Sequence, residues 1–294
     1  MNNHPQPRTA FVAAALLSLY LIWGSTYFAI RIGLDGFAPF TLASVRFLLA
    51  GSALYLGLRW RGARNPDALQ WRNAAVTGVL LLGLGNGLVC YAEQSVGSGL
   101  AAVAIASVPL FAALFSVLFG DWPRRGEWAA VLVGLAGVVL LNLGGDLRSP
   151  PAGAAALLLA AATWAMGSVW SRRQPLPAGA MNTAVQMLAG GLALALMAAV
   201  TGEHWHARPG VPALLAMVYL VVFGSLVGFS AYLWLLRNVR PVLATSYAYV
   251  NPPVAVLLGV ALGGERIGAM DLAGMAVILA AVVMLTLGRV APSR

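Results

Sequence analysis

The sequence is dominated by long runs of apolar residues, separated by short segments that carry arginine and proline. A helix needs about 20 consecutive apolar residues to cross the hydrocarbon core of a bilayer. Runs of about this length recur along the whole chain, and polar residues within them are sparse. We therefore predict ten transmembrane helices, which extend approximately over residues 11–30, 39–58, 73–92, 98–119, 128–144, 152–171, 178–200, 212–235, 241–262 and 270–288.

The composition supports an all-α integral membrane protein. The chain has 294 residues, of which 60% are hydrophobic and only 9% are charged. Soluble domains carry roughly 25% charged residues, so an ordinary soluble domain is excluded. The net charge of +9 comes from arginines spread over the short connections. We therefore expect the lipid bilayer, and no nucleic acid, as the partner of this surface.

The placement of arginine predicts how the helices are oriented. If the N-terminus lies in the cytoplasm, most arginines fall in inner connections, including Arg59, Arg61, Arg64 and Arg72. Cytoplasmic loops of membrane proteins carry an excess of positive residues. We therefore predict a multi-pass protein of a bacterial inner membrane, with both termini in the cytoplasm.

The second half of the sequence repeats the first. When the halves are aligned, Pro109 falls on Pro252, and the apolar runs and arginine-containing loops stay in step. Each repeat, residues 1–146 and 147–294, holds five predicted helices. Because five is odd, the two repeats would enter the membrane from opposite sides. Inverted repeats are typical of secondary transporters, which bind substrate near the membrane midplane where the halves meet.

Three stretches carry a family resemblance. They are "IWGSTYFAIRIGLDGFAPFTLASVRFLLAG" (22–51), "LAGVVLL" (135–141) and "ATSYAYVNPPVAVLLGVALGGE" (244–265). They resemble segments of EamA-type members of the drug/metabolite transporter superfamily. The resemblance implies two inverted five-helix repeats, a central cavity and export of small metabolites, often amino acids. It also implies that helices 1, 3, 4, 6, 8 and 9 contribute most to the cavity, while helices 5 and 10 lie outside it.

Prolines lie inside two of the predicted helices. Pro109 lies in the fourth, and Pro252 and Pro253 follow Asn251 in the ninth. A proline in a helix interior removes a hydrogen bond, and membranes tolerate such breaks where the backbone is buried in protein or faces a water-filled cavity. We therefore predict that these helices line the transport path and that the prolines act as hinges. A packing kink without a role in transport is the alternative.

Aromatic and polar residues within the predicted spans are the candidate substrate contacts. Residues three, four or seven apart share a helix face, and polar groups within membrane spans usually face the protein interior. The candidates are Trp23, Tyr27, Asn86, Glu93, Trp164, Ser168, Gln186, Phe229, Tyr232, Tyr247 and Asn251. A cavity of this composition suits a small zwitterion or an amphipathic metabolite better than a polyanion.

Two charged residues near the outer ends of helices leave alternatives open. Glu93 could bind a substrate amine or exchange a proton, or it could pair with an outer arginine such as Arg31. Protons are therefore a candidate coupling ion. Arg46 lies about two turns into the second helix and could meet a substrate carboxylate. We expect its long side chain instead to reach outward to the membrane surface.

These observations predict a secondary transporter that exports small metabolites by alternating access around a central cavity. Amino acids or related amphipathic compounds are the preferred substrates, and drugs or metabolites such as nucleosides are the alternative. ATP-driven transport within this chain is excluded, because the GxxxxGK[ST] motif cannot occur in a chain without lysine. We do not expect an enzyme, since no HExxH or GxSxG pattern lies in a span.

Other partners are expected to be few. A non-transporting scaffold would need an additional domain or a long loop, and the chain has neither. The single cysteine, Cys90, offers no metal-binding spacing. We expect no metal and no cofactor, and we expect a monomer or a weak homodimer.

Overall fold

The computed structural model describes residues 9–96, 98–142, 151–203, 209–263 and 269–287, and all regular structure in these ranges is helical. The elements are α1 (Thr9–Leu34), α2 (Pro39–Trp60), α3 (Ala68–Gly78), η1 (Val79–Asn86), α4 (Gly87–Ala92), α5 (Ser98–Ile105), α6 (Val108–Leu118), α7 (Arg125–Asn142), α8 (Pro151–Ser171), α9 (Gly179–Val200), α10 (Val211–Tyr219), η2 (Leu220–Val227), α11 (Gly228–Asn238), α12 (Pro241–Ala244), α13 (Tyr247–Gly263) and α14 (Ala269–Leu287).

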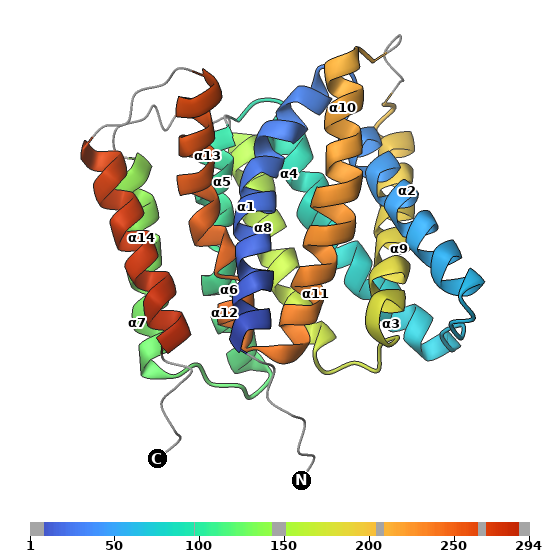
Figure 1. Cartoon of the computed structure of the whole chain (residues 1–294), viewed down its shortest axis with the longest axis horizontal. Helices are drawn as coiled ribbons and strands as arrows, with labels where there is room; N and C mark the ends of the chain where they lie inside the picture. The colour runs from blue at the N-terminus through green and yellow to red at the C-terminus, as the bar shows by residue number, and fades with distance from the viewer. Residues whose placement is uncertain (1–8, 97, 143–150, 204–208, 264–268, 288–294) are drawn as a thin grey trace.

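Several of these elements join end to end into rods. One rod consists of α3, η1 and α4, and another consists of α10, η2 and α11. Two further rods, α5 with α6 and α12 with α13, are each interrupted by two residues. We also call each remaining single helix, α1, α2, α7, α8, α9 and α14, a rod, and we number the rods in chain order. The rods of the described residues thus follow the order of the ten predicted spans (Figure 1). Six of the rods are long and apolar enough to cross a membrane.

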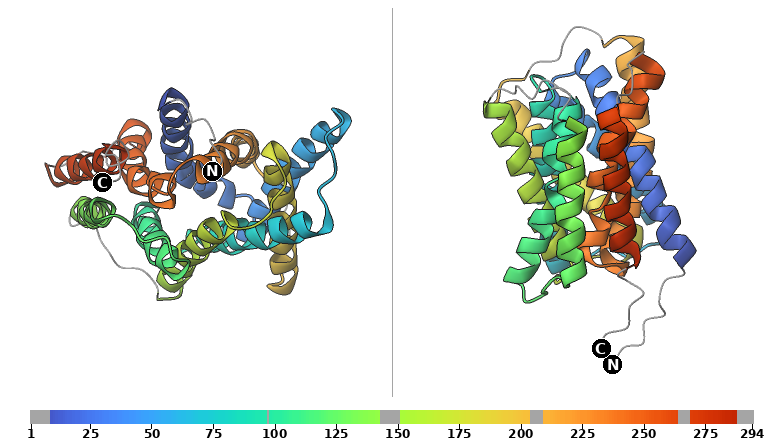
Figure 2. Two further views of the ribbon diagram at one scale, coloured as in Figure 1. Left: turned by 90° about the horizontal axis from the view of Figure 1, so that it is seen from below. Right: turned by 90° about the vertical axis from the view of Figure 1, so that its left-hand side faces the viewer.

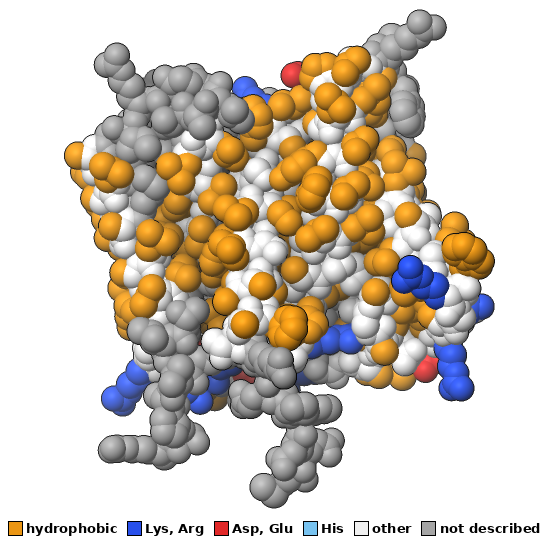
Figure 3. All heavy atoms as spheres, in the orientation of Figure 1, with side chains coloured by type: hydrophobic (Ala, Val, Ile, Leu, Met, Phe, Trp, Pro, Cys, Tyr) orange, Lys and Arg blue, Asp and Glu red, His pale blue; other side chains and the backbone are white. Residues whose placement is uncertain are grey.

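The rods stand side by side with an apolar outer surface. Leu17, Leu132 and Leu196 are among the exposed large side chains. Figure 3 shows hydrophobic side chains over the middle of the visible surface and arginines along its lower rim. We call this lower side the terminal face, because α1 begins and α14 ends there (Figure 1). The surface therefore matches a lipid environment bounded by a basic rim.

The packing of helix pairs shows which helices lie at the edge of the bundle and which lie nearer its centre. α2 packs along α9, and α7 packs along α14. The α7–α14 pair lies at one end of the bundle, whereas α1, α8 and α11 lie nearer its centre (Figure 2). These two edge helices are the predicted fifth and tenth spans. They occupy the outer position that the family resemblance implies.

Two rods contain a π-helical segment near the middle. The segments are η1 in the third rod and η2 in the eighth, and a glycine follows each of them, Gly87 and Gly228. In a π-helix the backbone bonds reach residue i+5, which is rare and frequent at functional sites. The sequence patterns did not predict these segments, and both of them contribute to the cavity described below.

Both proline-containing rods are interrupted, but only one interruption lies beside a predicted proline. The fourth rod is interrupted between Ile105 and Val108, and Pro109 lies in the first turn of α6. A proline fits this position, because the N–H group that it lacks would have no partner within the helix. The predicted break therefore lies just before Pro109.

In the ninth rod the predicted position of the break is wrong. Pro252 and Pro253 lie inside α13, and the interruption is at Thr245 and Ser246, more than one turn earlier. The hydroxyl groups of these two residues donate to backbone carbonyls within the same chain segment. Such bonds offer the backbone an alternative to the helical pattern, so the break follows the hydroxyl pair and not the prolines.

Candidate functional site

A cavity lies between the central rods of the bundle. Residues of α1, α2, η1, α4, α5, α6, α8, η2, α11 and α13 line it, and described residues of α7, α9 and α14 do not. Its volume is about 60 Å³, which leaves room for only a few water molecules. A metabolite therefore enters only when side chains rotate or helices move apart.

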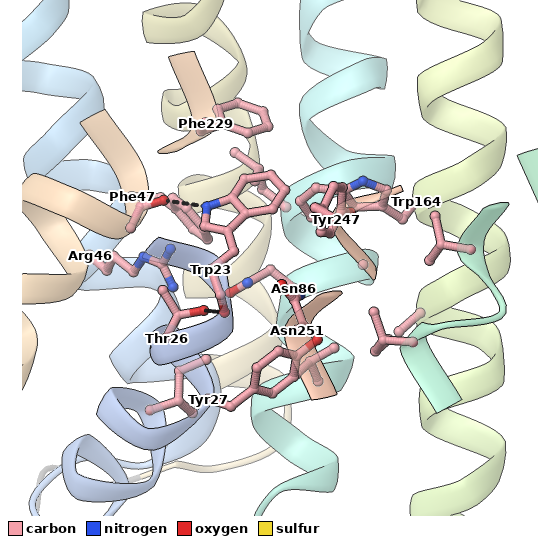
Figure 4. Close-up of a pocket in the computed structure, with 18 residues that line it drawn as sticks. Trp23, Thr26, Tyr27, Arg46, Phe47, Asn86, Trp164, Phe229, Tyr247 and Asn251 are labelled. Atoms are coloured by element: carbon pink, nitrogen blue, oxygen red, sulfur yellow. Dashed lines mark hydrogen bonds between the residues drawn. The ribbon is translucent and has the colours of Figure 1, made fainter. Parts of the chain in front are cut away.

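Most of the predicted contact residues meet at this cavity. Those that line it are Trp23, Tyr27, Asn86, Trp164, Phe229, Tyr247 and Asn251. Figure 4 shows the Trp23 indole near the centre of the group, with Arg46 and Thr26 on one side and Trp164 and Tyr247 on the other. The side-chain oxygen of Asn251 is buried and has no hydrogen-bond partner. The walls thus combine aromatic faces with a few polar groups, as in many small-molecule sites.

Four aromatic rings form a cluster at the end of the cavity nearer the terminal face. We call Trp23, Trp164, Tyr232 and Tyr247 the aromatic cluster. Ring centroids lie 5.5 Å apart for Trp23 and Trp164, 4.6 Å for Trp23 and Tyr247, and 5.6 Å for Tyr232 and Tyr247. The Trp164 Nε1 atom donates to the Tyr232 hydroxyl over 2.9 Å, and Ser168 lies 2.5 Å from that hydroxyl. Tyr232 and Ser168, two predicted contacts, are therefore not among the residues that line the cavity, and they bond to each other beside Trp164, which does line it.

Trp23 also links the first rod to η2. Its Nε1 atom donates to the backbone carbonyl of Gly224 over 3.0 Å. A Cβ atom at Gly228 would lie 2.4 Å from the same nitrogen. The glycine pair, four residues apart, therefore lets the indole approach the η2 backbone directly, as small residues do at interfaces of membrane helices.

Glu93 is buried beyond the last residue of α4, on the side of the cavity away from the terminal face. The residue is 3% exposed, and neither carboxylate oxygen has a hydrogen-bond partner among the described residues. The predicted pairing with Arg31 is therefore not made, although the Arg31 charge acts on this carboxyl at longer range. An ionised carboxylate buried without a partner is costly, so this environment favours the protonated form.

Arg46 faces the cavity and not the membrane surface. Its side chain is 3% exposed, and Nε donates to the Ser225 hydroxyl over 2.7 Å. The guanidinium carbon lies 4.7 Å from the centre of the Phe47 ring. The expected outward reach is wrong because Arg46 begins about 10 Å from the start of α2, at 1.5 Å per residue, while η2 offers a hydroxyl close by.

Gln186, like Glu93, is a predicted contact that does not line the cavity. It lies on α9, is fully buried, and donates from Nε2 to Asn182 over 2.9 Å. The α9 backbone at Gln186 packs against Gly78, where a Cβ atom would lie 2.3 Å from the Gln186 carbonyl oxygen. The Gln186 backbone therefore belongs to the packing of α3 against α9, while its side chain bonds within α9.

Ion pairs on the terminal face join different parts of the chain. Arg173 lies 2.7 Å from Asp121, and Arg240 lies 2.5 Å from Glu127. Asp121 follows the fourth rod and Glu127 lies in the first turn of α7, whereas both arginines belong to the second half of the chain. Burial lowers the pKa of the neighbouring Arg172, and the Asp121 carboxylate opposes this change. These contacts hold the terminal face together below the aromatic cluster.

An apolar bundle around a buried cavity of aromatic and polar side chains defines the class of polytopic membrane transporters. The profile of the EamA-like transporter family matches the chain twice, over residues 10–143 and 151–287. The chain therefore belongs to the EamA-like transporter family.

Similar proteins agree with this family. The uncharacterized inner membrane transporter YedA of Escherichia coli (strain K12) is 49% identical, over 94% of this chain and 90% of its own length. A probable terminal-alkyne amino-acid exporter of Streptantibioticus cattleyicolor is 27% identical over 94% of each chain. Protein PecM of Dickeya dadantii is 28% identical, over 90% and 88% of the two chains.

The fold also matches a solved structure. One crystal structure superposes with a TM-score of 0.76 and 23% identity, covering 95% of this chain and 97% of its own. Family, relatives and helical architecture together show an integral membrane transporter.

Proposed function

We propose that the protein is a secondary transporter that exports small amphipathic metabolites, amino acids foremost, by alternating access. The observation that carries this proposal is the buried central cavity, whose walls join aromatic rings to isolated polar groups. Aromatic faces suit the apolar part of such a substrate, and the polar groups fix its orientation. The amino-acid exporter among the relatives supports the choice of the first substrates to test.

Two inverted repeats, residues 1–146 and 147–294, are the proposed moving parts. The family profile matches once within each half. The π-helical segments occupy corresponding rods, the third and the eighth. Helices at corresponding positions pack together as α2 with α9 and α7 with α14. Rocking of one repeat against the other would open the cavity to each side in turn.

The terminal face is proposed to be cytoplasmic. Arginines gather along it (Figure 3), and positive residues are enriched on the cytoplasmic side. The inner membrane location of the Escherichia coli relative supports a bacterial inner membrane. With this orientation, the aromatic cluster and the ion pairs close the cavity toward the cytoplasm.

Efflux from proteoliposomes tests the proposed function. Vesicles containing the purified protein are loaded with labelled amino acids, and efflux is followed with and without a pH gradient. We expect selective efflux of a subset of amino acids at a rate at least about tenfold above that of protein-free vesicles. If no amino acid moves, the preferred substrate class is wrong, and nucleosides and drugs form the next panel. Efflux of nothing in either panel contradicts the transporter proposal.

A further inference from the structure

Arg46 is a permanent charge in the wall of the cavity. A guanidinium is not deprotonated in proteins, and a charge buried within a membrane is costly and usually functional. Its Nε atom is bound by Ser225, but no hydrogen bond from its two terminal nitrogens to a described group is found. These two nitrogens form the fork that matches a carboxylate.

No described acid pairs with this charge: Glu93, buried at the outer end of the third rod, forms no ion pair with Arg46 and favours its neutral form, and Asp35 is exposed. Asp121 and Glu127 form ion pairs on the terminal face. Asp67 caps α3, and Glu203 accepts hydrogen bonds from the first turn of α2. None of the ion pairs among the described residues involves Arg46, and none of the residues lining the cavity is acidic. The wall of the cavity therefore carries one positive charge that no described acid pairs with.

The surroundings of Arg46 are built to hold the guanidinium toward the cavity. Phe47 lies under the guanidinium at 4.7 Å, and Ser225 fixes Nε. A Cβ atom at Gly224 would lie 2.8 Å from Nη2, so glycine at this position leaves the space that the side chain occupies. Figure 4 shows the guanidinium beside Trp23 and Thr26, which line the same cavity.

From this arrangement we propose that Arg46 binds a carboxylate on the transported molecule. The substrate class is then an organic acid with one carboxylate, whose apolar body packs against Trp23, Trp164 and Phe229. An amine is not required, because none of the described residues that line the cavity is acidic. This inference rests on the proposed transport function and narrows its substrates to carboxylates, with or without an amino group.

Matched ligands test the inference on the unaltered protein. Thermal stability of the purified full-length chain is measured with pairs of acid and amide that share one apolar body. The pairs are phenylalanine and phenylalaninamide, 3-phenylpropionate and 3-phenylpropionamide, and leucine and leucinamide. For at least one of the three apolar bodies, we expect the acid to bind roughly tenfold more tightly than its amide, as judged from the concentration of each ligand that stabilises the protein. The reason is that the amide lacks the charged hydrogen-bonding group. Equal effects of acid and amide, or no stabilisation by any acid, would overturn the proposal.

Variants then assign the preference to Arg46. Arg46→Gln is expected to abolish the difference between acid and amide, and Arg46→Lys to retain part of it as a point charge. Arg59→Gln is the matched control, because it removes a positive charge from the exposed end of the same helix. If Arg46→Gln keeps the full preference for acids, the assignment is wrong. If the variant does not fold, the ligand pairs on the unaltered protein still decide.

The same measurements separate this inference from the proposed function. Acid-selective binding that depends on Arg46, in a protein that shows no efflux, would reject the transport proposal alone. Efflux that treats acids and their amides alike would keep the transporter and reject the carboxylate site.

Discussion

Replacing Trp23 with alanine is expected to reduce substrate efflux at least about tenfold. This side chain contacts Trp164, Tyr232 and Tyr247 and donates a hydrogen bond to Gly224. Aromatic pairs contribute about 0.5–1.5 kcal/mol each beyond area burial, and about 1.4 kcal/mol corresponds to a factor of ten. The substitution removes a wall of the cavity and also opens the aromatic cluster. Efflux of a labelled substrate from proteoliposomes measures the effect.

Two controls show whether the effect belongs to the cavity. Trp23→Phe keeps a ring but loses the donor to Gly224, so we expect an intermediate rate. Trp60→Ala removes a side chain that is 93% exposed at the end of α2, and we expect a rate close to that of the unaltered protein. Efflux at the normal rate in a folded Trp23→Ala variant would show that the indole does not take part in transport.

Replacing Glu93 with glutamine is expected to remove the response of efflux to a proton gradient. In the described conformation this carboxyl is buried without a partner, which favours its neutral form. In the proposed exchange, the carboxyl takes up a proton when the nearby outer end opens to acidic water, and it releases this proton when the cavity opens to the cytoplasm. Coupled export then exchanges a proton for the substrate. With the vesicle interior representing the cytoplasm, we expect an acidic external solution to accelerate substrate efflux through the unaltered protein.

The glutamine variant mimics the protonated carboxyl permanently. We expect it to transport at a rate that is the same with and without the gradient, while Glu93→Asp keeps part of the acceleration. Tyr27, Arg31 and Cys90 interact electrostatically with the Glu93 carboxyl. Cys90→Ala therefore serves as a control for the thiol. Equal acceleration of the unaltered protein and Glu93→Gln would exclude Glu93 as the proton-carrying group.

The length and order of the apolar runs predicted the helical architecture. Runs of about membrane-spanning length translate directly into rods, because each backbone hydrogen bond in a bilayer must be satisfied within the segment. The shared faces of Trp23 with Tyr27 and of Tyr247 with Asn251 likewise placed those side chains correctly at the cavity. Spacing along one helix is a local property, and these pairs depend on little else.

Features that depend on a neighbouring helix were not predictable in this way. Arg46 turns inward because η2 presents Ser225 and leaves space at Gly224, and the sequence does not say which helix faces α2. Gln186 occupies the position on the seventh predicted helix that corresponds to Arg46 on the second, yet its backbone packs on Gly78 and its side chain bonds to Asn182 within α9. Symmetry of sequence therefore does not guarantee symmetry of environment.

The sequence patterns also failed to predict where the backbone of the ninth rod is interrupted, because prolines and hydroxyl residues there favour different positions. Pro252 and Pro253 suggested a break, but Thr245 and Ser246 mark the actual interruption with hydroxyl-to-carbonyl bonds. No residue type encodes a π-helical segment uniquely, so η1 and η2 have no comparable signal. The glycines that follow them are the nearest indication, and glycine is too common in this chain to be specific.

The central claim is that the cavity opens to each side of the membrane in turn. Its most direct test is side-specific labelling of Asn86→Cys, a cavity position, in a Cys90→Ala background. A membrane-impermeant thiol reagent is added to one side of oriented vesicles at a time, with and without a transported substrate. We predict that the position reacts from both sides and that substrate changes the ratio of the two rates. Reaction from a single side under every condition would contradict alternating access.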